Sequence, residues 1–303
     1  MEHRQLGKDG PDIPVVGLGA FPLGGAMGRL DEQVAIDTVR AAIDSGITLI
    51  DTARGYQTSE ETIGKALKGG YRDRCFLATK VSGDFSREGL VSSMEDSLRA
   101  LDIDHVDLYQ IHRWDPEYPM DESMEALARL QADGKTRYIG VCNSDNQQMS
   151  QARQVAPFQS NQIRYNLFDR RIEGEGGLSF CEREGIGVLT HSALAKGLLV
   201  GKYGANYTFP ADDMRADSEK FQGEMLARFV ATADRLKEVA SGKGLSLVQL
   251  SIAWELRLPA ITAVLVGAKS PAQVEGYAGG VGVTFDSDEL DRIEEILAEA
   301  PDY

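Results

Sequence analysis

The sequence predicts a single (β/α)8 barrel, in which eight parallel strands close into a cylinder surrounded by helices. Three observations predict it. Short apolar runs alternate with amphipathic helical patterns at about thirty residues per unit, the units are enough for eight strands, and no linker rich in Pro, Gly or Ser divides the chain. Such alternation gives parallel strands joined by right-handed crossovers, and eight units favour a closed barrel over an open sheet. We therefore treat residues 1–303 as one domain.

The strands are expected at the apolar runs. Most of these runs are uninterrupted rather than alternating, which is typical of parallel strands covered on both faces. The first run follows about a dozen residues that could form a small hairpin and close the bottom of the barrel. The runs are Val15–Leu18, Ile47–Ile50, Phe76–Thr79, Val106–Ile111, Tyr138–Val141, Gln159–Ile163, Gly187–Thr190 and Thr262–Val266.

Helices are expected between the strands, because apolar residues recur there at helical spacing. Leu127 and Leu130 belong to such a stripe, in a segment that ends at Gly134. A glycine there is typical of the position just past a helix C-terminus. Two further stripes are Leu90, Met94, Leu98 and Leu101, and Val34, Val39 and Ile43.

One connection departs from the regular spacing. The segment between the last two runs is much longer than the others, and it begins with a loop over roughly Gly201–Gly223 that precedes two helical patterns. Loops of this length in compact domains are commonly functional. Because this loop follows a strand, it would lie at the catalytic face of the barrel, where it is a candidate lid.

Composition and charge argue against several classes of protein. Hydrophobic residues make up 42% of the 303 residues, and the formal net charge is −15. This profile is typical of a globular protein rather than a disordered one. The acidic balance argues against nucleic acid as a partner, since phosphate backbones bind basic faces. A small anionic ligand needs only a local cluster of positive groups.

The sequence also predicts a cytoplasmic protein with no membrane partner. No apolar run approaches the roughly 18 residues that cross a bilayer, and the N-terminus has no apolar leader. Cys75, Cys142 and Cys181 lie far apart, and no CxxC occurs. This usage argues against disulfides and a zinc site and fits a reducing compartment.

Four ionisable side chains follow three successive predicted strands. Asp51 comes directly after ITLI, Tyr56 five residues later, Lys80 after FLAT and His112 after LYQI. Singly, they could be a cap, a loop aromatic, a solvated cation and a rim histidine. Because the C-terminal ends of barrel strands meet at the catalytic face, we expect the four to form one site, here called the tetrad.

The residue types of the tetrad fit proton transfer to or from a carbonyl or alcohol oxygen. The ordinary pKa of tyrosine is about 10, and a neighbouring lysine ammonium stabilises the phenolate and lowers this pKa. Asp51 would hold the ammonium in place, and His112 could orient the reacting oxygen. We therefore expect Tyr56 to be a general acid or base with a pKa lowered by Lys80.

The spacing Asp51-Thr-Ala-x-x-Tyr56, with Lys80 and His112, resembles that of the aldo-keto reductases. The resemblance covers nearly the whole chain. Other similar stretches are GLGAFPLGG (17–25), GVCNSD (140–145), QIRYNLFDR (162–170), SALAKGLLVGK (192–202) and VLVGAKSPAQV (264–274). The resemblance implies a (β/α)8 barrel that reduces an aldehyde or ketone with NAD(P)H, or the reverse, without a Rossmann domain. It also implies that Tyr56 is the general acid or base, that Lys80 and Asp51 tune it, and that His112 orients the substrate oxygen.

The same resemblance assigns the cofactor contacts. Asn143 and Gln162 would hold the nicotinamide carboxamide, because amide side chains both donate and accept hydrogen bonds. The stretch 192–202 would wrap the pyrophosphate, where its glycines permit close backbone approach. The expected cofactor residues are Ala20, Phe21, Asn143, Ser144, Gln162, His191, Ser192, Leu194, Lys196, Gly197, Leu198, Gly201, Lys202, Gly267, Lys269, Ser270 and Gln273.

The choice between NADP(H) and NAD(H) depends on the stretch after the last strand. Ser270, Pro271 and Gln273 have the pattern of a capping box with proline at N1. A helix N-terminus beside Lys269 would bind an anion, and by resemblance this anion is the adenosine 2′-phosphate of NADP(H). Glu275, where many relatives carry an arginine, would be unfavourable there, so NAD(H) stays the alternative.

The sequence says less about the substrate pocket than about the cofactor contacts. Phe21, Tyr56, His112 and Trp114 are expected to line the substrate pocket, in which a small carbonyl or alcohol compound would bind. His191 stands where relatives usually carry a tyrosine that stacks on the nicotinamide. Nothing in the sequence identifies the carbonyl compound or the oligomeric state.

Two other functions stay open. A lysine at the end of a barrel strand is also where a Schiff-base aldolase holds its nucleophile, and Lys80 occupies such a position. The same fold also serves non-catalytic NADP(H)-binding subunits such as the β-subunits of potassium channels. The complete tetrad and the five cofactor-like stretches favour the reductase.

Overall fold

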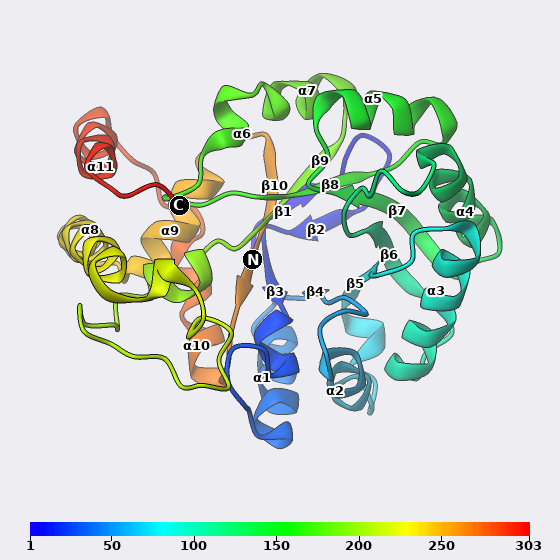
Figure 1. Ribbon diagram of the computed structural model, residues 1–303, viewed down its shortest axis with the longest axis horizontal. Coiled ribbons are helices and arrows are strands. Elements are labelled where there is room, and N and C mark those ends of the chain that lie inside the picture. Colours follow the sequence, from blue (N-terminus) through cyan, green and yellow to red (C-terminus); the bar gives the residue numbers. More distant parts are fainter.

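Eight parallel strands close into a barrel in the computed structural model, which describes all 303 residues (Figure 1). The strands pair in chain order, and the last pairs with the first to close the cylinder, which confirms the predicted fold. They are β3 (Val16–Gly19), β4 (Leu49–Asp51), β5 (Phe76–Val81), β6 (Val106–Ile111), β7 (Thr136–Cys142), β8 (Ser160–Arg164), β9 (Gly187–His191) and β10 (Ile261–Gly267).

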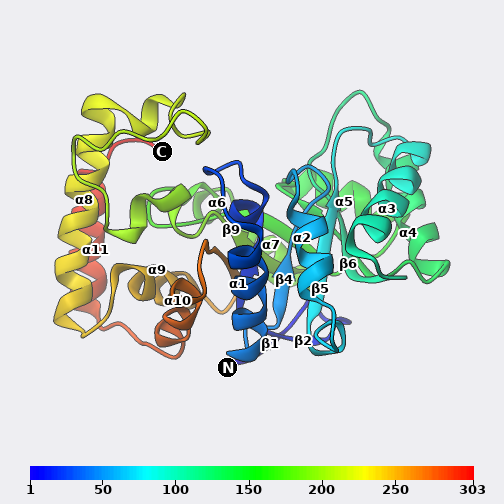
Figure 2. The ribbon, with the colours of Figure 1, turned by 90° about the horizontal axis from the view of Figure 1, so that it is seen from below.

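Helices cover the outside of the barrel, and none of them is both long and apolar enough to cross a membrane (Figure 1). Figure 2 shows α8 and α11 lying side by side at one flank, where they contact each other. The helices are α1 (Glu32–Asp44), α2 (Ser59–Ala66), α3 (Arg87–Leu101), α4 (Met120–Ala132), α5 (Asn146–Val155), α6 (Arg171–Gly174), α7 (Gly177–Glu184), α8 (Gly223–Gly242), α9 (Leu247–Leu256), α10 (Pro271–Glu275) and α11 (Ser287–Ala298). Short 3-10 turns are η1 (Phe21–Gly24), η2 (Arg72–Arg74), η3 (Ala195–Val200), η4 (Glu219–Phe221) and η5 (Tyr277–Gly280).

The helix stripes read from the sequence bury their apolar faces against the barrel. The four apolar residues predicted to form a stripe in α3 are all buried. Helix α4 ends as predicted, because Gly134 follows its last turn with a φ of 74°, a left-handed conformation that glycine adopts without steric cost.

The apolar core has two parts. The larger one lies between the strands and the helices. The smaller one fills the lower interior of the barrel, where barrel side chains pack with Leu6 and Ile13. These two residues flank the loop of an antiparallel hairpin formed by β1 (His3–Gln5) and β2 (Asp12–Pro14), which closes the bottom as predicted.

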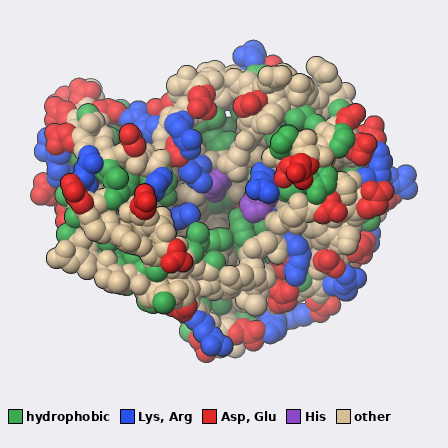
Figure 3. All heavy atoms as spheres, in the orientation of Figure 1, with side chains coloured by type: hydrophobic (Ala, Val, Ile, Leu, Met, Phe, Trp, Pro, Cys, Tyr) green, Lys and Arg blue, Asp and Glu red, His purple; other side chains and the backbone are tan.

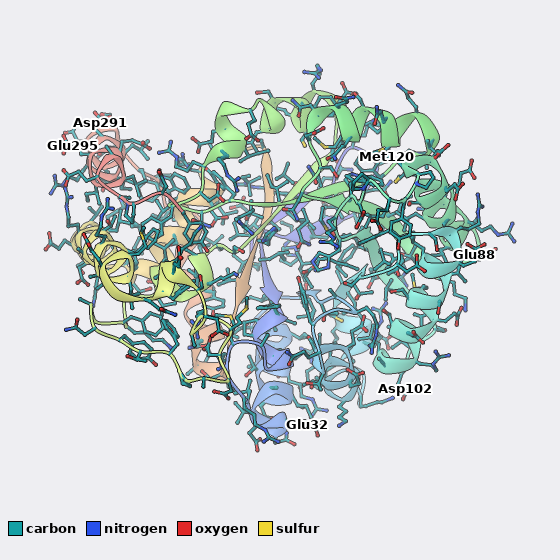
Figure 4. All side chains as sticks on the ribbon, in the orientation of Figure 1. Glu32, Glu88, Asp102, Met120, Asp291 and Glu295 are labelled. Carbon is teal, nitrogen blue, oxygen red and sulfur yellow. The ribbon has the colours of Figure 1, made fainter.

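The acidic surplus of the chain lies on the outer helices. Figure 4 labels Glu32 in α1, Glu88 in α3 and Glu295 in α11, and all three lie on the periphery, away from the barrel axis. Glu32 and Glu88 are in the first turns of their helices, where a negative charge is stabilised by the helix dipole. The tetrad lies at the other end of the barrel, opposite the hairpin.

Candidate active site

The tetrad converges at the C-terminal end of the barrel. Asp51 ends β4, Lys80 lies on β5 and His112 directly follows β6, so three neighbouring parallel strands deliver their side chains to one place. The Nζ of Lys80 lies 2.6 Å from Oδ1 of Asp51 and 3.4 Å from Oη of Tyr56. The Oη of Tyr56 lies 3.4 Å from Nε2 of His112. The structure therefore brings together all four residues that the sequence pattern selected.

Lys80 is fully buried and carries its charge. Its ammonium donates to Asp51 and to the backbone oxygen of Thr52, at 2.6 and 2.7 Å. Burial by itself lowers the pKa of Lys80, but the Asp51 carboxylate beside it raises the pKa above its ordinary value. Lys80 is therefore protonated at neutral pH.

Two buried amides fix the other oxygen of Asp51. Gln162 donates to Oδ2 at 2.9 Å and Gln110 donates to the same atom at 3.3 Å. Gln162 was predicted to hold the nicotinamide, and its amide nitrogen here is directed to Asp51 instead. Gln110 was not predicted, although it lies two residues before His112 and period-2 alternation places both on the inner face of the strand.

The pKa of Tyr56 is the point at which our expectation was wrong. Burial raises the pKa of its phenol, and Lys80 opposes this rise without overcoming it, so the pKa lies above its ordinary value. The physical reason is that the Lys80 charge is shared with Asp51, while a phenolate would lose its water. Tyr56 is therefore a protonated donor at neutral pH.

His112 is neutral. Burial and the nearby charges of Lys80 and Arg113 lower the pKa of its imidazole to about 3. Its Nδ1 lies 3.1 Å from the hydroxyl oxygen of Ser82, and its Nε2 faces Tyr56. A neutral imidazole held at both nitrogens has a fixed ring plane and can offer one hydrogen bond to a substrate oxygen.

A cleft of about 680 Å³ extends from the tetrad across the ends of β3, β9 and β10. Figure 3 shows this face of the molecule, where histidine and basic side chains meet around a central hollow. Most of the expected cofactor residues line the cleft: Phe21, Gln162, His191, Ser192, Leu194, Lys196, Gly197, Lys202, Gly267, Lys269 and Gln273. Ala20, Asn143, Ser144, Leu198, Gly201 and Ser270 do not line it, and Asn143 borders a second cavity instead.

Asn143 and His191 form one unit at the junction of the cleft and a second cavity. The Oδ1 of Asn143 lies 3.0 Å from Nε2 of His191, and Nδ1 of the same ring lies 3.0 Å from Oγ of Ser192. Burial, with the charge of Arg164, lowers the pKa of His191 to about 3, so this ring is also neutral. The Asn143 amide nitrogen has no such partner and is free to donate.

Trp114 takes a different place from the one expected. It was predicted to line the substrate pocket, but it borders neither the cleft nor the second cavity. Its indole nitrogen donates to Oγ of Ser144 at 2.6 Å, and its ring packs on the core. The structure thus joins two predicted ligand-binding residues to each other, since a partly buried indole N–H needs an acceptor.

The stretch after β9 has an unusual backbone. Ser192, Ala195 and Lys196 have φ values of 61°, 46° and 52°, which are costly for residues with a Cβ. Gly197 follows at 102°, and a Cβ there would approach a guanidinium nitrogen of Arg215 to 2.9 Å. Arg215 in turn donates to the Lys196 carbonyl at 2.9 Å, which holds the strained turn in place.

The loop 201–223, here called the strap, is tied across the mouth of the barrel. The backbone N–H of Met214 donates to the Ala26 carbonyl at 3.0 Å, and the N–H of Arg29 donates to Asp212 at 3.1 Å. Asp213 and Arg215 form a buried ion pair, with 2.9 Å between Oδ1 and Nε. Its aromatic side chains also pack together, namely Tyr203, Tyr207 and Phe209, with Phe221 against Phe209. The position fits the predicted lid, and its movement stays a prediction.

The predicted capping box after β10 is absent. The side chain of Ser270 caps nothing, and the Gln273 oxygen instead accepts from the backbone N–H of Lys269 at 2.7 Å. Ser270 has an extended backbone, with φ of −158°. The Lys269 ammonium donates to the carbonyl oxygens of Met27 and Gly28, at 2.7 and 3.3 Å. Lys269 therefore joins two segments of the rim, the stretch after β10 and the loop 26–29, rather than standing free.

Several cleft residues were missed by the sequence reading. Arg29, Asp213 and Arg215 lie in loops. Arg29 bonds to Asp212 and Arg215 bonds to the Lys196 carbonyl, both far along the chain, so no local pattern places these residues in the cleft. Arg164 could have been found, because it is two residues beyond Gln162 on the same face of β8.

Comparisons with known proteins agree with this geometry. A sequence model described as "Aldo/keto reductase family" matches residues 15–298. The chain is 38% identical to aldo-keto reductase YhdN of Bacillus subtilis (strain 168), over 98% of this chain and 94% of that protein. It is 31% identical to L-glyceraldehyde 3-phosphate reductase of Escherichia coli (strain K12), over 99% and 93% of the two chains.

Solved structures give the same result. The glycerol dehydrogenase AKR11B4 from Gluconobacter oxydans superposes with a TM-score of 0.86 at 35% identity, over 98% of this chain and 95% of that one. The match covers the barrel and its connecting loops alike. With the tetrad in place at the ends of β4 to β6, the chain belongs to the aldo/keto reductase family.

Proposed function

We propose that this protein is an NADP(H)-dependent oxidoreductase that reduces an aldehyde or ketone to an alcohol, or catalyses the reverse. Family membership supports oxidoreductase activity on carbonyl compounds. One observation carries the finer assignment. The Tyr56 hydroxyl lies 3.4 Å from a charged lysine and 3.4 Å from a neutral histidine, beside a cleft large enough for a nucleotide.

The protein supplies the proton and the electrostatics of the reaction. When bound, the nicotinamide exchanges a hydride with the carbonyl carbon. Tyr56 gives its proton to the carbonyl oxygen, and the Lys80 ammonium stabilises the phenolate that is left. Asp51 keeps this ammonium in place, and neutral His112 donates a hydrogen bond to the same oxygen. In the reverse direction, the phenolate takes the proton from the alcohol.

The cleft has the donors that NADP(H) requires. The free amide nitrogen of Asn143 would hold the carboxamide, and the neutral ring of His191 would lie against the nicotinamide. Lys196 and Lys202 line the cleft beside the strained turn and would face the phosphates. A small cavity of about 150 Å³, bordered by Leu194, Val200, Gly276 and Tyr277, would accept the adenine.

Lys269 would select the 2′-phosphate. It lies on the rim between the loop 26–29 and the strap. A bound phosphate would replace the backbone carbonyls as the acceptor for the Lys269 ammonium. Its charged oxygens form stronger hydrogen bonds than carbonyl oxygens do. Glu275 is exposed on α10 and works against this preference.

A Schiff-base function for Lys80 has less support. Its ammonium is fully buried, donates to Asp51 and Thr52, and has a raised pKa. A Schiff-base lysine needs a neutral amine that can reach the substrate. Two relatives, a glycerol dehydrogenase and an L-glyceraldehyde 3-phosphate reductase, favour a short polyol-derived substrate for this protein.

The test is a titration of the purified protein with NADPH and separately with NADH, followed by intrinsic fluorescence, together with NADPH oxidation over a panel of aldehydes and ketones. We expect tight quenching by NADPH, weaker quenching by NADH and turnover of short aldehydes. Tight NADPH binding with no turnover of any carbonyl would instead support a non-catalytic cofactor-binding protein. Absence of binding by either nucleotide would contradict the proposal.

A further inference from the structure

A second cavity of about 450 Å³ adjoins the tetrad. It shares Tyr56, His112 and His191 with the main cleft, so a molecule bound there would reach the proton donor. Eleven residues border it, and the only charged ones among them are Arg113 and Arg164. No carboxylate borders this cavity.

The two arginines reach the cavity from separate strands. Arg113 directly follows His112 beyond β6, and Arg164 ends β8. Because β7 lies between these strands in the barrel, the two guanidinium groups are delivered from different parts of the wall. A ligand held by both would have its reacting end fixed relative to Tyr56.

Neither guanidinium group has all of its N–H donors bonded within the protein. Arg113 lies 3.5 Å from Asp115, and Arg164 lies 3.9 Å from Asp169. Asp169 already accepts two hydrogen bonds from Arg171, at 2.9 and 2.8 Å. The side chains of Arg113 and Arg164 are 68% and 41% exposed, so their N–H donors face solvent in and around the cavity.

Apart from these two long ion pairs, the neighbouring ionisable groups add no net negative charge. His112 and His191 are neutral, and the charge of Lys80 is matched by Asp51. The lining of the cavity is thus a local positive site in a chain of net charge −15. A cleft lined by one sign of charge concentrates ligands of the opposite sign.

We propose that the substrate is a short carbonyl compound that carries an oxyanion, a carboxylate or a phosphate, and that Arg113 and Arg164 bind this group while Tyr56 meets the carbonyl. This inference rests on the proposed reductase function. Planar guanidinium groups bind carboxylate and phosphate through paired hydrogen bonds. A neutral substrate would leave the two guanidinium groups with only their long ion pairs to Asp115 and Asp169.

The test compares matched substrates on the full chain with NADPH. One pair is glyceraldehyde 3-phosphate and glyceraldehyde, and the other is 4-carboxybenzaldehyde and benzaldehyde. We expect kcat/KM to be at least about tenfold higher for the anionic member of one or both pairs, since about 1.4 kcal/mol corresponds to a factor of ten. The pair with the larger ratio distinguishes phosphate from carboxylate.

Variants assign the preference to the arginines. Arg113→Gln and Arg164→Gln should each lower the anionic-to-neutral ratio about threefold, and the double variant should bring it near one. Arg99→Gln on α3 is the matched control, because Arg99 is exposed and remote from the cavity, and it should leave the ratio unchanged. A wild-type ratio near one, or a ratio that both variants leave unchanged, would overturn the inference while leaving the reductase function intact.

A binding experiment keeps the two proposals separate. Calorimetric titration with glycerol 3-phosphate, succinate and glycerol needs no turnover. Arginine-dependent binding of an anion without reduction of any carbonyl would support the anion site and contradict the reductase function. Because Arg164 also borders the main cleft, the NADPH Kd of Arg164→Gln is measured as well. A larger loss in NADPH affinity than in the substrate ratio would assign Arg164 to the cofactor and overturn its role here.

Discussion

The floor of the cleft and its rim are built on different principles. On the floor, Asp51 and Lys80 lie on adjacent strands, are buried, and bond to neighbours fixed by strand register. On the rim, loops far apart in the chain meet, as where Lys269 bonds to the carbonyl of Met27. The difference shows where each function needs rigidity: proton transfer needs fixed distances, whereas nucleotide entry and release need segments that open.

The largest effect should come from breaking the floor at its charge pair. Lys80→Met removes the cation beside Tyr56 and leaves Asp51 buried without a counter-charge. We expect kcat to fall about 10²- to 10⁴-fold and the free energy of unfolding to fall by about 3–5 kcal/mol. Steady-state kinetics and urea unfolding measure both.

A double variant separates chemistry from folding in this prediction. Asp51→Asn with Lys80→Met removes both charges, so most of the lost stability should return while activity stays low. Recovery of activity together with stability would mean that Lys80 acts only on the fold.

A smaller effect should come from breaking the rim. Asp213→Asn weakens the buried pair with Arg215, which supports the strained turn at Lys196. We expect the NADPH Kd to rise about tenfold, about 1.4 kcal/mol, with kcat for a saturating substrate changed far less than in Lys80→Met. Asp217→Asn, an exposed position of the same strap, is the control. An equal loss of kcat would show that the rim also positions the reacting groups.

The pH profile sharpens the comparison further. In the proposed mechanism, reduction needs protonated Tyr56, and its raised pKa keeps Tyr56 protonated until the pH exceeds the ordinary value for tyrosine. Carbonyl reduction should therefore be flat between about pH 6 and 9 with respect to this group, whereas alcohol oxidation should rise with pH because it needs the phenolate. A reductive rate that falls through pH 7–8 would show that Lys80 outweighs burial once ligands are bound.

The smallest effect concerns acid stability. His191 has a pKa of about 3 in the fold against 6.5 in its ordinary state, so the native state binds fewer protons than the unfolded chain. The contribution of neutral His191 to the free energy of unfolding is therefore fully present above pH 6.5 and is lost as the pH falls toward 3. Urea unfolding at pH 7 and pH 5 measures this effect. His191→Asn should reduce the loss in the free energy of unfolding between the two pH values by about 1 kcal/mol. If His191→Asn loses as much unfolding free energy between pH 7 and pH 5 as the unaltered protein, the acid sensitivity belongs to other groups.

The contrast between floor and rim also explains what the sequence could predict. The tetrad was predictable, because strand ends of a barrel meet whatever the loops do, and Asp51, Lys80 and His112 each end or follow a strand. The bond of Arg215 to the Lys196 carbonyl and the carbonyl partners of Lys269 were not predictable, because they depend on how loops far apart in the chain meet at the rim. The pKa of Tyr56 was misjudged, since burial is a property of the whole fold and the Lys80 charge is local.

The most direct measurement is a single-turnover experiment on Tyr56→Phe, which follows NADPH oxidation after mixing with saturating aldehyde, beside an NADPH titration of the same variant. Tyr71→Phe, whose hydroxyl bonds to Asp44 on the outer surface, is the matched control. We predict that Tyr56→Phe binds NADPH as the unaltered protein does and oxidises it at least about 10²-fold more slowly. Oxidation of NADPH at the unaltered rate would contradict the assignment of Tyr56 as the proton donor.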